Sequence, residues 1–159
     1  MSRPLRPVGI DFVESAPLRL VYAAELSASP EDIYHALADD VSGWPRWFTA
    51  VTAARPLGQG TGREIRLRGG AVLRETILAA QPSERYAYRV DEANTPGLRA
   101  LVEEWLLTPA GNGTRLRWTF AVDGSGPFRF ALRLGRPGMG RAFRDAARRL
   151  DERLRGPAA

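Results

Sequence analysis

The sequence predicts an α+β domain in which helices cover one face of a curved antiparallel sheet. From Val51 to Val122 apolar residues recur at every second position, the period of half-buried strands. Short turns rich in Gly, Pro, Asn and Ser separate these segments without room for helical crossovers, which favours an antiparallel meander. A helical period precedes this region and returns after Gly126, so helices and strands are segregated along the chain.

The domain organisation follows from length and pattern. A chain of 159 residues is long enough for one domain with a sizeable core, which we place at residues 18–155. Residues 1–17 are predicted to form an N-terminal tail, and its apolar segment 10–13 either adds an edge strand or lies on the surface. Residues 156–159 form a short C-terminal tail.

The first strand and the helices after it carry clear local signals. Residues 18–26 alternate in the manner of a strand. Ser29 is a preferred N-cap, Pro30 stands at the first helical position, and Asp32 is where a capping-box acid would lie. The apolar residues of the segment 33–37 then recur at helical spacing. After a break at 41–43, the aromatic-rich segment from Trp44 to Phe48 is expected to form a second short helix or turn.

The remaining elements are six strands and a C-terminal helical region. The strands, which bring the sheet to about seven, are expected at residues 51–57, 62–68, 72–79, 85–90, 98–107 and 114–122. A helical piece at 128–134 ends at the break 135–138, and a long amphipathic helix then covers 139–154. The apolar stripe of this long helix consists of Met139, Phe143, Ala146, Leu150 and Leu154.

Composition excludes several classes of function. The chain has no cysteine and one histidine, His35, so neither a thiolate nor a His-based metal site is expected, and we predict no cofactor. Its net charge is +5, and all 23 basic residues are arginines that appear dispersed along the sequence, typical of solvated faces. No apolar run is long enough to span a bilayer and no signal-peptide pattern is present. We therefore expect a cytoplasmic protein without stable membrane insertion or a nucleic-acid partner.

Several segments together resemble a known superfamily. They are the strand-to-helix junction 25–34, the aromatic segment 44–48, the strand ends 105–109 and 113–116, and the helix 143–154. In order and separation they are similar to those of the SRPBCC superfamily, the helix-grip fold shared by START lipid-transfer domains and the birch-pollen allergen family. Within it, the chain looks most like the bacterial polyketide cyclase/dehydrase and lipid-transport group.

The resemblance implies a curved sheet wrapped around the long C-terminal helix, with a cavity between them for an apolar or aromatic small molecule. The alternative is that the aromatic residues fill the core and leave no pocket. The candidate ligand-binding residues are Trp47, Phe48, Tyr86, Tyr88, Trp105, Trp118, Phe120, Met139, Phe143 and Ala146.

Two carboxylates are candidates for acid–base chemistry. Glu75 shares a strand face with Leu73 and Ile77, and Glu103 shares one with Leu101 and Trp105. If these faces are concave, desolvation would raise the pKa of both carboxyl groups and suit them to proton transfer. The alternatives are that they pair with arginines, such as those at 74, 89 or 117, or that a bulge places them outside.

His35 lies away from the apolar helix face and lacks an orienting partner in the sequence, so we expect a surface or boundary residue rather than a general base.

Three functions are compatible with this pattern. The leading hypothesis is a binder of a lipid or polyketide-like molecule. The alternative is a polyketide cyclase or dehydratase that uses a cavity carboxylate as acid or base. A third is an interaction module that applies the arginine-rich helix to nucleic acid or an anionic surface. The ligand, the oligomeric state and whether a reaction is catalysed stay open at this level.

Overall fold

The computed structural model describes residues 1–156 and contains one eight-stranded sheet with four α-helices. The strands are β1 (Arg3–Pro4), β2 (Leu18–Leu26), β3 (Val51–Leu57), β4 (Gly62–Leu67), β5 (Val72–Gln81), β6 (Arg85–Ala93), β7 (Leu98–Ala110) and β8 (Gly113–Gly124). The helices are α1 (Phe12–Ser15), α2 (Pro30–Tyr34), α3 (Gly126–Leu134) and α4 (Arg136–Arg155).

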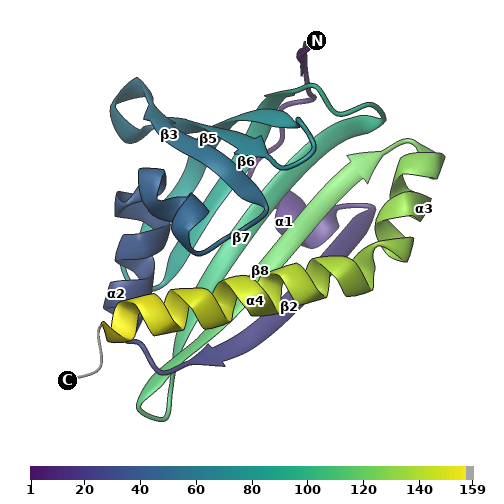
Figure 1. The fold of residues 1–159 in the computed structure, drawn as a ribbon. Helices are drawn as coiled ribbons and strands as arrows, with labels where there is room; N and C mark the ends of the chain where they lie inside the picture. The colour runs from purple at the N-terminus through teal and green to yellow at the C-terminus, as the bar shows by residue number, and fades with distance from the viewer. Residues whose placement is uncertain (157–159) are drawn as a thin grey trace.

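The sheet is antiparallel throughout, in the order β2-β8-β7-β6-β5-β4-β3, with the two-residue β1 paired to β6. The strands β3 to β8 form the predicted meander. The earlier strand β2 pairs with β8 and forms the edge of the sheet opposite β3. The sheet curves, and α4 runs along its concave side (Figure 1). This arrangement confirms the predicted α+β helix-grip fold.

The segment between β2 and β3 is helical, with different turns along its length. Ser29 caps α2 as predicted, its Oγ accepting a hydrogen bond from the backbone N–H of Asp32 at 3.1 Å. The chain then passes through a π-helical turn at His35–Asp39 and a 3₁₀-helix at Val41–Arg46. The expected break at 41–43 is therefore displaced to Asp40, whose backbone is not helical, and residues 41–43 belong to the 3₁₀-helix.

The N-terminal segment covers the convex side of the sheet. In Figure 1, α1 lies on the opposite side of the sheet from α4. Phe12 and Val13 are buried there in a small cluster with Ala100 and Val102 of β7 and Ala121 of β8. Together with the β1–β6 pairing, this cluster ties residues 1–17 to the sheet.

The main core lies between the concave face and α4. Phe143, Ala146 and Leu150 of α4 point into it and are almost fully buried. The helix is also tied by Asp151, whose carboxylate accepts hydrogen bonds from the backbone N–H groups of Ser27 and Ala28, each at 3.0 Å. Within residues 1–156, no helix is long and apolar enough to cross a membrane.

Candidate ligand-binding cavity

A cavity of about 360 Å³ lies between the concave sheet, the 3₁₀-helix at Val41–Arg46, α3 and the first turns of α4. Its walls are mostly apolar, supplied by leucines and isoleucine of β4, β5 and β7 together with the aromatic residues. Five of the sequence-predicted binding residues line it: Phe48, Tyr88, Trp118, Phe120 and Met139. Both candidate carboxylates, Glu75 and Glu103, line it as well.

The other five predicted binding residues lie in the core next to the cavity rather than on its wall. They are Trp47, Tyr86, Trp105, Phe143 and Ala146, each no more than 2% exposed. The rings of Trp105 and Trp118 stack with centroids 5.3 Å apart, and Phe143 stacks on Trp118 at 5.9 Å. This stack lies behind the part of the wall that Trp118 forms, in the stacked arrangement that aromatic pairs prefer.

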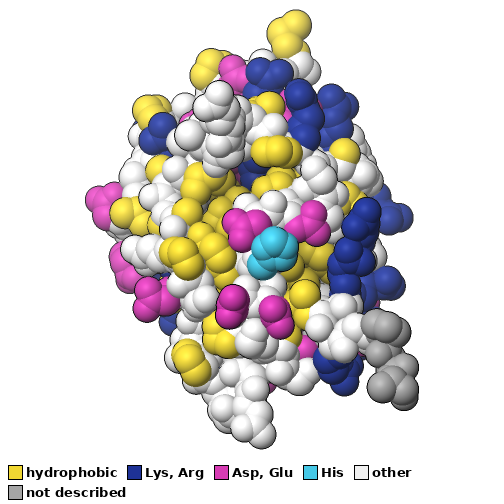
Figure 2. Space-filling view, turned by 90° about the vertical axis from the view of Figure 1, so that its left-hand side faces the viewer, with side chains coloured by type: hydrophobic (Ala, Val, Ile, Leu, Met, Phe, Trp, Pro, Cys, Tyr) yellow, Lys and Arg dark blue, Asp and Glu magenta, His cyan; other side chains and the backbone are white. Residues whose placement is uncertain are grey.

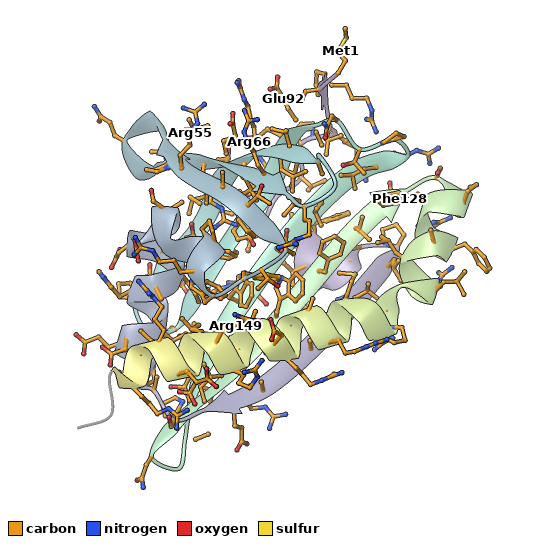
Figure 3. All side chains as sticks on the ribbon, viewed as in Figure 1. Met1, Arg55, Arg66, Glu92, Phe128 and Arg149 are labelled. Atoms are coloured by element: carbon orange, nitrogen blue, oxygen red, sulfur yellow. The ribbon has the colours of Figure 1, made fainter. Side chains whose placement is uncertain are left out.

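The space beside α4 lies one turn nearer the N-terminus than the sequence pattern suggested. Ala146 is buried in the core and does not border the cavity, whereas Ala142 does. Phe128 and Leu132 of α3 complete this end of the wall. Phe128 comes from the first turns of α3, where that helix follows β8 (Figure 3).

One buried cation lies at the cavity wall. Arg63 of β4 is 1% exposed, and its Nε donates a hydrogen bond to Glu75 Oε1 of the neighbouring strand at 2.5 Å. Its guanidinium carbon also lies 3.9 Å from the ring centroid of Tyr88 and 4.3 Å from that of Trp44, both within cation–π range. Among the described residues, Nη1 of this arginine has no hydrogen-bond partner.

Glu103 belongs to the same polar cluster but forms no ion pair with an arginine among the described residues. Its Oε1 accepts hydrogen bonds from Tyr88 Oη at 3.0 Å and from Trp118 Nε1 at 2.9 Å. Trp105 Nε1 in turn donates to Tyr88 Oη at 3.2 Å. The sheet register explains this grouping, because Arg63 faces Glu75 across β4–β5 and Tyr88 faces Glu103 across β6–β7.

Burial changes the proton affinity of this cluster. It raises the pKa of Glu75 to about 7, against the opposing effect of Arg63, and the neighbouring Glu103 adds to the rise. Burial likewise raises the pKa of Glu103, although Arg63 and the hydrogen bonds from Tyr88 and Trp118 oppose it. Burial alone would lower the pKa of Arg63, but Glu75 and the facing tyrosines raise it, so the guanidinium stays charged.

The charge count of the cluster therefore favours one bound proton for the two carboxyl groups. With both carboxylates ionised, one guanidinium faces two anions in an apolar wall, which leaves an uncompensated buried negative charge. One proton on either Glu75 or Glu103 makes the cluster neutral, and because the charge of one affects the other, the two groups titrate as a pair.

Arg63 was not among the candidate site residues, although the sequence carries a signal for it. It is in phase with Ile65 and Leu67, the apolar face of β4, and out of phase with the solvent-facing Arg66. An arginine on the buried face of a strand needs a buried partner. Figure 3 shows Arg66 and Arg55 pointing away from the side of the sheet that carries α4.

His35 lies outside the cavity wall. Its side chain is 68% exposed, and its Nδ1 lies 3.1 Å from Asp39 Oδ2 one turn along the chain. Figure 2 shows this histidine on the surface among acidic side chains.

In this structure a curved sheet wraps around a long C-terminal helix, and an apolar cavity lies between them. This is the helix-grip fold of the SRPBCC superfamily. Solved structures share this fold. A START superfamily protein from Mycobacterium smegmatis superposes with a TM-score of 0.67 at 14% identity, covering 86% of this chain and 97% of its own. The major latex-like protein 151 from Panax ginseng gives 0.67 at 10% identity, with coverage of 86% and 97%.

The sequence comparisons narrow the assignment. Residues 17–155 match the family described as polyketide cyclase / dehydrase and lipid transport. An uncharacterized protein of Mycobacterium tuberculosis (strain H37Rv) is 36% identical over 152 residues, which cover 92% of this chain and 90% of the relative. The chain thus belongs to the polyketide cyclase/dehydrase and lipid-transport family.

Proposed function

We propose that the protein binds an apolar small molecule, about two fused rings in size, that carries one neutral carbonyl or hydroxyl oxygen. An apolar cavity of about 150 Å³ holds benzene, so about 360 Å³ accommodates a larger ring system. The observation that carries the proposal is the unpartnered Nη1 of Arg63 in the wall of this cavity. A buried N–H donor without an acceptor is costly, and a ligand oxygen would satisfy it.

The same cluster argues against an anionic ligand such as a fatty-acid carboxylate. With one proton on the carboxyl pair, Arg63 is already balanced by one anion, so an added carboxylate would be a second anion beside one guanidinium. In an apolar wall this charge is not screened by water. A neutral oxygen acceptor takes the free N–H without adding charge.

A matched pair of probes tests this preference. We expect 2-acetylnaphthalene, a neutral ketone, to bind at pH 8 with an affinity at least about tenfold higher than that of 2-naphthoate, its carboxylate counterpart. Isothermal titration calorimetry measures both. Equal affinities, or tighter binding of the carboxylate, would contradict the preference for a neutral oxygen.

A cavity-filling variant tests whether the site is the described cavity. Ala142→Trp places an indole in the space beside the first turns of α4 and should abolish binding of the ketone. Ala131→Trp adds the same side chain at an exposed position of α3 and should leave binding unchanged. A folded Ala142→Trp protein that binds like the wild type would place the site elsewhere.

The second candidate function is cyclisation or dehydration of a poly-β-ketone, favoured by the carboxyl pair. With a substrate carbonyl on Arg63 Nη1, an ionised Glu75 would accept a proton from the carbon next to that carbonyl, and the guanidinium would stabilise the resulting enolate. Return of that proton to a departing β-hydroxyl would release water.

The carrier and the enzyme differ in one measurement. For the enzyme, Glu75→Gln should lower kcat by about 100-fold or more, while binding of the neutral ketone is retained. The matched control is Glu84→Gln, which changes an exposed carboxylate outside the cavity. Unchanged turnover of a candidate polyketide by Glu75→Gln would remove Glu75 from the reaction.

A further inference from the structure

The helix α3 is apolar on two opposite faces. Phe128 and Leu132 line the cavity on one face. Phe130 and Leu134, also four residues apart and therefore on one face, are 60% and 68% exposed. With Met1 they are the only large apolar side chains so exposed among the described residues. Large apolar side chains exposed together on one helix face are typical of a surface that meets a protein partner, a ligand or a membrane.

The same region carries the positive charge of the protein. Residues 126–159 contain nine arginines and three acidic residues, whereas residues 1–125 contain fourteen and fifteen, so the net charge of +5 comes entirely from the C-terminal region. Residues 124–144 contain five arginines and no acidic residue. The arginines are spread along the whole chain, but the excess of positive over negative charge lies in its C-terminal stretch.

The arginines next to Phe130 and Leu134 are available for an external partner. Arg133 and Arg136 are exposed, and the ion pairs of α4 in the described structure begin only at Asp145.

We propose that α3 and the first turn of α4 form a peripheral docking surface for an anionic lipid bilayer. Phe130 and Leu134 would enter the boundary between headgroups and acyl chains, while Arg133 and Arg136 contact lipid phosphates. Phosphate binding on nucleic acid needs the arginines but not two exposed apolar side chains on one helix face, which is why we commit to a lipid surface. Two inserted side chains give reversible, salt-sensitive binding rather than anchoring.

Docking in this orientation would place a wall of the cavity against the membrane. The face of α3 opposite Phe130 and Leu134 borders the cavity, so the helix separates the bilayer from the ligand site by its own thickness. The docking proposal rests on the exposed face and the charge distribution alone, and it does not require the ligand proposed above.

The absence of cysteine from the chain allows a site-specific test. An environment-sensitive dye is attached to Phe130→Cys or, as the control, to Ala53→Cys at an exposed position of β3. With vesicles of phosphatidylcholine and phosphatidylglycerol at low salt, emission of the Phe130→Cys dye should shift to the blue, and that of the Ala53→Cys dye should not. Vesicles of phosphatidylcholine alone should produce no shift.

Sedimentation with the same vesicles tests the apolar contribution in unlabelled protein. The double variant Phe130→Ser/Leu134→Ser should bind at least about tenfold more weakly than the wild type, with its fold checked by circular dichroism. No binding of the wild type to phosphatidylglycerol vesicles at low salt would overturn the proposal. So would equal dye responses at the two positions, or DNA binding that competes with the vesicles and is unaffected in the double variant.

Discussion

Replacing Glu75 with glutamine should change how the stability of the protein depends on pH. Burial raises the pKa of Glu75 from its ordinary value of 4.5 to about 7. The folded state therefore holds more protons than the unfolded state between these two values. The free energy of unfolding contributed by this group is largest below about pH 4.5, falls as pH rises to about 7, and is level above it. This difference in pKa corresponds to about 3 kcal/mol.

Glu75→Gln keeps a neutral side chain at all pH values and so removes the fall in the free energy of unfolding that ionisation of Glu75 causes. Relative to wild type, the free energy of unfolding of the variant should rise by about 3 kcal/mol between about pH 4.5 and about pH 8, as measured by urea denaturation. Glu84→Gln, at an exposed carboxylate, should give a difference that does not change with pH. A pH-independent difference for Glu75→Gln would refute the assignment of a raised pKa to this carboxyl.

Two further predictions concern stability. Arg63→Met removes the only cation of the buried cluster and should lower the free energy of unfolding by about 3–5 kcal/mol at pH 8. The loss should be smaller at pH 5, where the carboxyl groups are largely protonated. Equal losses at the two pH values would contradict the charge count. Gly113→Ala should lower the free energy of unfolding by more than about 2 kcal/mol, because a Cβ there would lie 2.0 Å from the carbonyl oxygen of Leu26. Gly126→Ala, with open space around the new Cβ, is the thermal-denaturation control, and equal melting temperatures for the two variants would contradict this reasoning.

Local patterns were enough to locate most elements. The predicted bounds of β2 and β3 agree with the structure, because alternation and turn residues act over a few neighbouring positions. The N-cap at Ser29 and the amphipathic stripe of α4 are likewise properties of short segments. The position of Arg63 on the buried face of β4 could be predicted in the same way, because it lies two residues from the buried Ile65.

The composition of the site depended on contacts between distant strands. Bulges in the β5–β6 ladder, on either side of Glu75, shift the register, and the face that this side chain occupies is decided by how the two strands pair. The position of the cavity beside Ala142 rather than Ala146 likewise depends on how α4 crosses the sheet.

The sequence by itself determined an α+β chain with a meander, a capped helix and a long amphipathic C-terminal helix, because each of these follows from local spacing. Only the tertiary structure decided that Arg63, Glu75 and Glu103 share one buried cluster. The physical reason is that charge and burial at a site are set by what folding brings together across the sheet, and no window of consecutive residues contains that information.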